Sequence, residues 1–280
     1  MEQLAQHRKN SFSPLFGWSI LLAIPLMISC NRAEKQKDVR MPTDLTTVAE
    51  KPASFQELGF FGPIKADKWT DFLNAVQQNI YQSRKEAGNI SFSLYLPENG
   101  HLGPIWFERF ENKAAHNHHK GQSYFKEAIK VIQESLEGAP KSITLQEIKE
   151  IPAAIPITAG EPERTRHIIV LFHLRPEKRK LFVESMAEVA RRSRNFPGNL
   201  EFNIYQYEDD PNKFVVMEGW ASIAEHEVQL QQDYIKTLRA KTQGFFVSDP
   251  MDSRWPVRDI SVKMSTPLEQ DRGAYSKGPK

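Results

Sequence analysis

Cysteine is almost absent from this sequence. Its 280 residues contain one, Cys30, so no disulfide can form within the chain and no zinc site can be built from cysteines. An excess of charge of either sign is also lacking, because 37 basic and 35 acidic side chains leave a net charge of +2. Nucleic-acid-binding domains usually carry a basic excess, so we expect no nucleic-acid partner.

A hydrophobic run long enough to span a membrane comfortably is missing as well. The most apolar segment, residues 15–29, is 15 residues long, whereas a spanning helix needs about 20. It follows the basic residues His7, Arg8 and Lys9 and ends on the small residue Ser29. These features are typical of a secretory signal peptide, which we expect over residues 1–29. An uncleaved signal anchor with an incidental cysteine is the alternative.

The end of this segment, Met27-Ile28-Ser29-Cys30, resembles the lipobox of bacterial lipoproteins, although Met27 stands where leucine is usual. The resemblance implies lipidation of Cys30 and a place in the cell envelope, anchored to a bacterial membrane and facing the periplasm or lying in the outer membrane. Several acyl chains hold a protein to a membrane far more firmly than one. Residues 30–53 are polar and lack apolar periodicity, so we expect a tether there. Residues 263–280 are expected to form a tail.

The chain repeats itself at a spacing of 110 residues. The identities include Ser83-Arg84 with Ser193-Arg194, Gly88-Asn89 with Gly198-Asn199, Phe92 with Phe202, Tyr95 with Tyr205, Glu108 with Glu218, His116 with His226 and Tyr124 with Tyr234. So many matches at one spacing indicate a tandem duplication. We therefore expect two domains, residues 54–150 and 166–262, joined by a proline-containing linker, residues 151–165.

Each copy predicts the same order of elements. In the first, apolar runs predict strands at 55–64, 90–96, 105–110 and 142–148, with helices over 67–85 and 113–137. In the second, strands are expected at 167–174, 200–206 and 214–220 and from 245–247 onward, with helices over 178–194 and 223–241. The order β-α-β-β-α-β predicts an α+β, ferredoxin-like unit with helices on one face of an antiparallel sheet. The other copy can cover the open face and edges.

Short motifs recur in both copies in the same order. They are S-R-x-x-(A/P)-G-N-(I/L), then F-x-x-Y, then E-x-(F/W), then A-x-H leading to Q-x-Y. Together they resemble the antibiotic biosynthesis monooxygenase (ABM) family, and most closely its quinol-monooxygenase branch. The resemblance implies that the two tandem domains close into an intrachain dimeric α/β barrel, a monomeric pseudo-dimer that can also pair as a homodimer.

The same resemblance implies cofactor-free oxygenation of a small aromatic or quinol-like compound, in a cavity between the sheet and helices of each unit. Such chemistry needs a proton acceptor, donors that hold the resulting anion, and exclusion of water. His116 and His226 are the candidate acceptors, because imidazole titrates near neutrality. Tyr124 and Tyr234 stand where many members carry a second histidine. For the histidines, a structural role at the start of a helix is the alternative.

The candidate substrate-binding residues are Tyr95, Tyr205, Phe92, Phe202, Arg84, Arg194, Trp106 and Trp220. For the tyrosines and phenylalanines the alternative is core packing. For Arg84 and Arg194 it is an ion pair with Glu108 and Glu218, which we favour over substrate binding.

A metal site is not expected, although His116, His118 and His119 lie close together in the sequence. The second copy has Val228 and Gln229 in place of the last two, and no acidic residue accompanies them at a familiar ligand spacing. The second copy keeps more of the family pattern, which makes it the candidate active copy. Two other functions stay open: a non-catalytic ligand-binding or interaction lipoprotein, and an isomerase of a small metabolite.

Overall fold

A computed structural model describes residues 53–98 and 103–262. The predicted signal peptide 1–29, the lipidation site Cys30, nearly all of the tether 30–53 and the tail 263–280 lie outside these residues. Among the helices that are described, none combines the length and the apolar character needed to cross a lipid bilayer.

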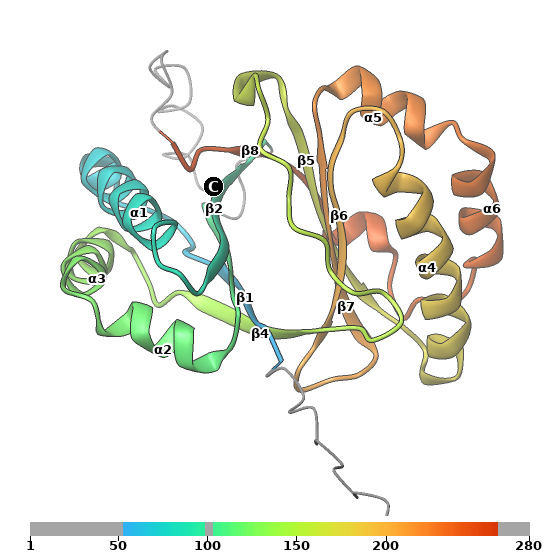
Figure 1. Cartoon of the computed structure of the whole chain (residues 1–280), viewed down its shortest axis with the longest axis horizontal. Coiled ribbons are helices and arrows are strands. Elements are labelled where there is room, and N and C mark those ends of the chain that lie inside the picture. The colour runs from blue at the N-terminus through green and yellow to red at the C-terminus, as the bar shows by residue number, and fades with distance from the viewer. Residues whose placement is uncertain (1–52, 99–102, 263–280) are drawn as a thin grey trace, which may run out of the picture. The chain divides into compact units, whose positions relative to one another are not determined.

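The two copies have the same succession of strands and helices (Figure 1). The first contains β1 (Phe55–Phe60), α1 (Trp69–Ser83), β2 (Asn89–Pro97), β3 (Ile105–Phe110), α2 (Lys113–Gly121), α3 (Ser123–Ser135) and β4 (Lys141–Glu147). The second contains β5 (Arg166–His173), α4 (Arg179–Arg194), β6 (Asn199–Tyr207), β7 (Lys213–Trp220), α5 (Ile223–Leu230), α6 (Asp233–Lys241) and β8 (Arg254–Asp259). Short 3-10 turns precede α1, β5, α4 and β8.

The eight strands form one closed antiparallel barrel in the order β1-β3-β2-β8-β5-β7-β6-β4. Each copy contributes four neighbouring strands, and the copies join where β2 pairs with β8 and where β4 pairs with β6. Helices α1 to α3 cover the outside of the first sheet, and α4 to α6 cover the second (Figure 1). The predicted α+β architecture, two ferredoxin-like units closed into an intrachain barrel, is confirmed.

Strand alternation divides the buried side chains between two kinds of core. Inward-facing residues from both sheets fill the barrel, among them Leu58, Phe107, Ile169 and Met217. Outward-facing residues pack against the helices in two further cores, one for each copy. Closure of the barrel therefore buries the faces that the two sheets would expose if they were apart.

Two expectations about the elements were wrong. The helices predicted over 113–137 and 223–241 are each two helices, because Gln122 (φ −67°, ψ 147°) and Gln232 (φ −65°, ψ 144°) have extended backbones. Residues 245–247 form only an isolated bridge between Phe246 and Leu174, and the last strand is β8. Three of the six residues of β8 are charged and another is a proline, so its sequence lacks an ordinary strand pattern.

Candidate functional site

The two predicted catalytic histidines occupy equivalent places between sheet and helices. His116 lies in the first turns of α2 and His226 in those of α5, and each is 3% exposed. The Nε2 atom of His116 is 3.4 Å from Oε1 of Glu108 on β3, and that of His226 is 3.7 Å from Oε2 of Glu218 on β7. Each histidine is therefore packed against a carboxyl group, which is buried in the first copy and partly buried in the second.

Burial sets the protonation of these pairs. Loss of hydration lowers the pKa of both His116 and His226 to about 4, with nearby lysines or arginines lowering it further. The pKa values of Glu108 and Glu218 are raised, again chiefly by burial. Both imidazoles are neutral at pH 7, but a base with a pKa near 4 accepts protons weakly there. The catalytic assignment of the two histidines stays a prediction.

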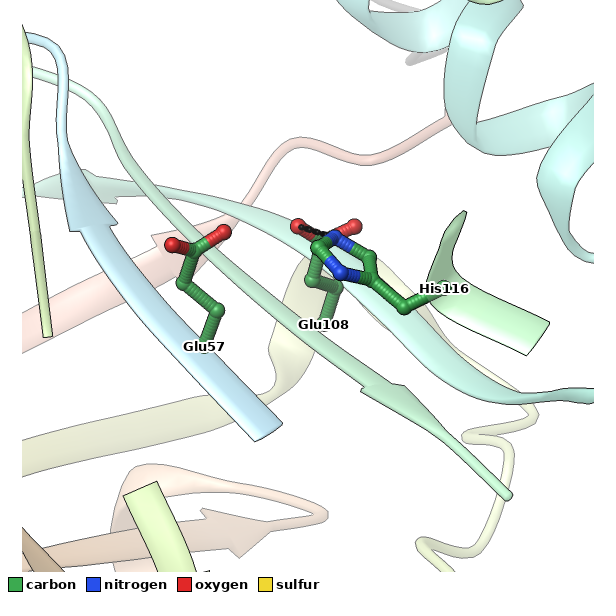
Figure 2. Close-up of side chains that lie close together, drawn as sticks. All are labelled: Glu57, Glu108 and His116. Atoms are coloured by element: carbon green, nitrogen blue, oxygen red, sulfur yellow. Dashed lines mark ion pairs between the residues drawn. The ribbon is translucent and has the colours of Figure 1, made fainter. Parts of the chain in front are cut away.

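A second acidic group joins the pair in the first copy alone. Glu57 of β1 lies directly across from Glu108 in the strand register. Its carboxylate group lies close to the carboxylate group of Glu108 and the imidazole ring of His116 (Figure 2). The equivalent position in the second copy, opposite Glu218 on β5, is Ile168. The two copies thus differ in the chemistry of this cluster.

The predicted tyrosines on the following helices also differ between copies. The hydroxyl of Tyr124 donates a hydrogen bond to Glu86, which also contacts Nδ1 of the buried His119 at 2.9 Å. The hydroxyl of Tyr234 has no hydrogen-bond partner among the described residues, and the guanidinium of Arg192 lies 5.5 Å from the centre of its ring. A role in catalysis for either tyrosine stays a prediction.

Four of the predicted substrate-binding aromatic residues lie on the helix side of the sheets. Phe92 belongs to the core of the first copy and Phe202 and Trp220 to that of the second. Trp106 packs against Phe61, with ring centres 4.5 Å apart. The indole of Trp220 donates a 3.3 Å hydrogen bond to Glu218 and stacks on the ring of His226. These contacts give each side chain a packing role.

The two predicted arginines act on backbone, and the expected ion pairs with Glu108 and Glu218 are absent from the described residues. Nε of Arg84 donates to the carbonyl of Phe92, and Nε of Arg194 to that of Phe202, both at 2.9 Å. Glu108 on β3 and Glu218 on β7 point toward the helices. Each pairs with a histidine there instead. The arginines therefore fasten the end of α1 to β2 and the end of α4 to β6.

Tyr95 and Tyr205 point into the barrel, away from the helices, and both are buried. The ring of Tyr95 lies 5.4 Å from that of His167. Its counterpart Tyr205 faces Arg109, whose guanidinium is 5.6 Å from the ring centre. This pair of tyrosines connects the predicted residues to the interior of the barrel.

One row of inward-facing positions leaves space at an end of the barrel. His167 on β5 and Glu201 on β6 both lie opposite Gly219 on β7. A Cβ atom at Gly219 would stand 3.1 Å from Nδ1 of His167 and 3.4 Å from Cβ of Glu201. The first copy has the fully buried Arg109 where the second has Gly219. The glycine thus lets His167 and Glu201 pack closely over the backbone of β7.

A cavity of about 370 Å³ opens beside this row, a volume within the range of small-molecule sites. We call it the barrel-end cavity; it is lined by Arg84, Ser91, Tyr95, Phe107, His167, Glu201 and Asp259, among others. Residues of the linker between the copies, including Pro156 to Ala159, complete its wall. Among the described groups, Oγ of Ser91 and Nδ1 of His167 are buried without a hydrogen-bond partner. Both residues line the cavity.

Asn203 on β6 holds the linker in this position. Its amide pairs with the backbone of Ala154, accepting from the N–H at 2.8 Å and donating to the carbonyl at 3.0 Å. Arg109 donates to the same carbonyl at 2.8 Å, and the N–H of Ile157 donates to the carbonyl of Leu200 at 2.9 Å. The linker is therefore built into the barrel.

Burial also gives the barrel-end cavity a group that titrates near neutrality. Desolvation raises the pKa of Glu201 to about 7, against the lowering effects of Asn203 and Arg109. The pKa of His167 is lowered by burial and that of Tyr95 is raised by it, so both are uncharged at pH 7. The cavity thus combines a carboxyl group that gains or loses its proton near pH 7 with His167 and Tyr95, which are uncharged at that pH.

Comparison with known proteins identifies the family. The family model described as antibiotic biosynthesis monooxygenase matches the chain twice, at residues 59–131 and 165–241. These two matches together span more than half of the chain. The chain belongs to the ABM family.

Two solved structures resemble this chain over most of its length. A proposed monooxygenase of Fusobacterium nucleatum is 16% identical with a TM-score of 0.69, the match covering 78% of this chain and 97% of that one. A second, from Lactobacillus acidophilus, is 15% identical with a TM-score of 0.64 and coverages of 74% and 94%. Each match is too long for a single copy, so both share the fold of the whole barrel.

Among curated proteins, the uncharacterized protein sll1783 of Synechocystis sp. is 33% identical over 87 residues, which are 31% of this chain. The match spans 58% of the length of that relative.

Sequence reasoning missed several polar groups of this ABM chain. Glu201 and Asn203 alternate with the core residues Phe202 and Ile204 on β6, which gave a signal. Alternating polar residues ordinarily face solvent, and barrel closure turns this face inward. The repeat gave no signal for Glu57. The first strands of the two copies correspond at a spacing of 111 residues, one more than in the rest of the repeat, so a comparison at 110 residues does not align them.

Proposed function

We propose that this ABM protein is a cofactor-free monooxygenase that acts on a small aromatic or quinol-like compound in the barrel-end cavity. The observation that carries the proposal is the buried carboxyl group of Glu201 in a cavity of about 370 Å³. A general base works best when its pKa is close to the working pH, and the pKa of Glu201 is raised to about 7. Membership in the ABM family supports an oxygenase reaction.

Each residue of the cavity has a part in this scheme. The carboxylate of Glu201 takes the proton of a ring hydroxyl, and the aromatic walls formed by Tyr95 and Phe107 pack against the ring. The hydroxyl of Ser91 and the imidazole of His167 supply hydrogen bonds to the bound compound. The resulting electron-rich anion reacts with dioxygen. One oxygen atom becomes a ring carbonyl, the other leaves as water, and the substrate supplies the electrons.

Replacing the proposed base tests this function. With a panel of quinols and hydroxyaromatic compounds, we expect dioxygen uptake by the wild type and a loss of about 10²- to 10⁴-fold in kcat for Glu201→Gln. The wild-type rate should rise as the pH increases through about 7, since Glu201 must be ionised, and the variant should lack this step. The matched control is Glu218→Gln, a partly buried glutamate of the same copy on the opposite face of the sheet.

Other results would redirect or refute the proposal. Full activity in Glu201→Gln, together with loss in His116→Ala or His226→Ala, would move the chemistry to the space between sheet and helices. Tight binding without any dioxygen uptake would indicate a binding protein. Product formation without dioxygen uptake would indicate an isomerase.

The proposal includes export and lipid anchoring at Cys30. It is supported by the lipobox-like residues Met27 to Cys30 after a short apolar segment. In a bacterial host we expect the wild type to incorporate labelled fatty acid and to sediment with membranes, and Cys30→Ser to do neither. Equal labelling of the two proteins would contradict this assignment.

A further inference from the structure

We propose that Glu57, Glu108 and His116 form a binding site for one divalent transition-metal ion in the first copy. The three residues come from β1, β3 and α2 and converge between the sheet and the helices (Figure 2). The site is separate from the barrel-end cavity, because Glu57 and Glu108 face the opposite side of the sheet. The inference therefore does not depend on the proposed oxygenase reaction.

The geometry suits a single ion. One ligand atom from each residue can be chosen so that all three lie within 4.8 Å of one another, and the Glu108 to His116 distance is 3.4 Å. Metal bonds of about 2.0–2.2 Å to nitrogen and oxygen place neighbouring ligand atoms roughly 3–4 Å apart. Side-chain movements of about 1 Å would bring the ligand atoms to this spacing.

The local structure holds these side chains in place. Glu57 and Glu108 are cross-strand neighbours in the register of β1 and β3. Asn112 caps α2 by accepting a 2.9 Å hydrogen bond from the N–H of Ala115, which fixes the turn that carries His116. The imidazole is stacked on the ring of Phe55, with centres 4.1 Å apart. The ligands are thus positioned before an ion arrives.

The charges of the cluster call for a cation. Among the described residues, no lysine or arginine forms an ion pair with either carboxylate, and the ion pair that Glu108 forms there is with His116. Glu108 is 5% exposed, and its Oε2 has no hydrogen-bond partner in the described part of the chain. Two carboxylates confined in this way repel each other unless a proton or a metal ion lies between them.

The second copy provides an internal comparison. It keeps the pair of Glu218 and His226, but Ile168 replaces the third ligand. The indole of Trp220 donates a hydrogen bond to Oε2 of Glu218, whereas the corresponding residue of the first copy, Phe110, has no donor. In the first copy the indole of Trp106 lies near Glu108, but Oε2 of Glu108 has no hydrogen-bond partner among the described residues.

The donor set indicates the class of ion. Two carboxylates and one imidazole suit Mn²⁺, Fe²⁺ or Zn²⁺, whereas Mg²⁺ and Ca²⁺ favour oxygen ligands throughout. Two carboxylates would neutralise the charge of one such ion. Three protein ligands leave coordination positions for water or a small molecule.

Titration of the chelator-treated full chain with Mn²⁺ or Zn²⁺ tests the site. We expect one ion to bind per chain. Calorimetry and the paramagnetic resonance signal of Mn²⁺ measure this binding. Glu57→Ile, which copies the second unit, should weaken binding by at least about 100-fold, since even losing the partner of a ligand costs 10- to 100-fold. Glu57→Gln is the second variant and should weaken binding likewise. Glu86→Gln is the matched control, because Glu86 pairs with His119 outside the cluster.

Two results would overturn the inference. If the folded wild type binds no stoichiometric ion, the two carboxyl groups share a proton instead. If both Glu57 variants bind as tightly as the wild type, the ion lies elsewhere. Glu201→Gln should bind metal normally, so the failure of the proposed oxygenase function and the failure of this site can be told apart.

Discussion

The two copies fill equivalent cross-strand positions with different residues. In the first, Gly59 on β1 lies opposite Trp106 on β3, and a Cβ atom at Gly59 would stand 1.9 Å from the indole. In the second, the same pair of positions holds Val170 and Val216, both buried. In the first copy the indole of Trp106 thus fills the space that two valine side chains share in the second. The indole has a structural reason to be at position 106.

This exchange predicts strong coupling between the two positions. Gly59→Val should destabilise the protein by about 1–3 kcal/mol through overpacking, and Trp106→Val by about 3 kcal/mol through the cavity it leaves. The double variant recreates the packing of the second copy, so its free energy of unfolding should return toward that of the wild type. Denaturant unfolding of all four proteins measures the coupling. Simple addition of the two losses would contradict it.

At the scale of elements, local pattern predicted most strands and helices because their apolar residues alternate or recur along one face. Strand β3 begins and ends as predicted, at Ile105 and Phe110. The break at Gln122 had one signal, the helix-weakening Gly121 just before it, which the prediction of a single helix over 113–137 did not use. Strand β8 was missed because its charged residues and proline lack a strand pattern, and pairing with β5 of its own copy and β2 of the other makes it a strand.

The linker is an element whose role appears only in three dimensions. Its prolines predicted a connection, yet the side chain of Asn203 binds the backbone of Ala154 on both sides. Asn203→Ala should leave the N–H of Ala154 unpaired, while Arg109 still donates to the carbonyl, at a cost of about 1–3 kcal/mol, and should speed amide hydrogen exchange around Ala154. The matched control is Ser93→Ala at the equivalent position of the first copy, which does not contact the linker. Unchanged exchange in Asn203→Ala would show that the linker is held by other contacts.

For the whole molecule, the duplication predicted two units and the family resemblance predicted their closure into one barrel. The sequence did not predict that the cavity would lie inside this barrel, because its walls come from both copies and from the linker. Ser91 comes from the first copy and Glu201 from the equivalent position of the second. The two copies have diverged and together line one cavity.

Shared construction of the barrel predicts that neither half is stable alone. The pairs of β2 with β8 and of β4 with β6 close the barrel, and the interior core draws on both sheets. A half alone exposes that apolar face and two strand edges, so we expect it to aggregate or to pair with a second copy of itself. Residues 53–160 and 161–262, produced together, should form a one-to-one complex that unfolds in a single transition, which light scattering and calorimetry can measure. Two stable, monomeric halves would show that each copy is an independent domain.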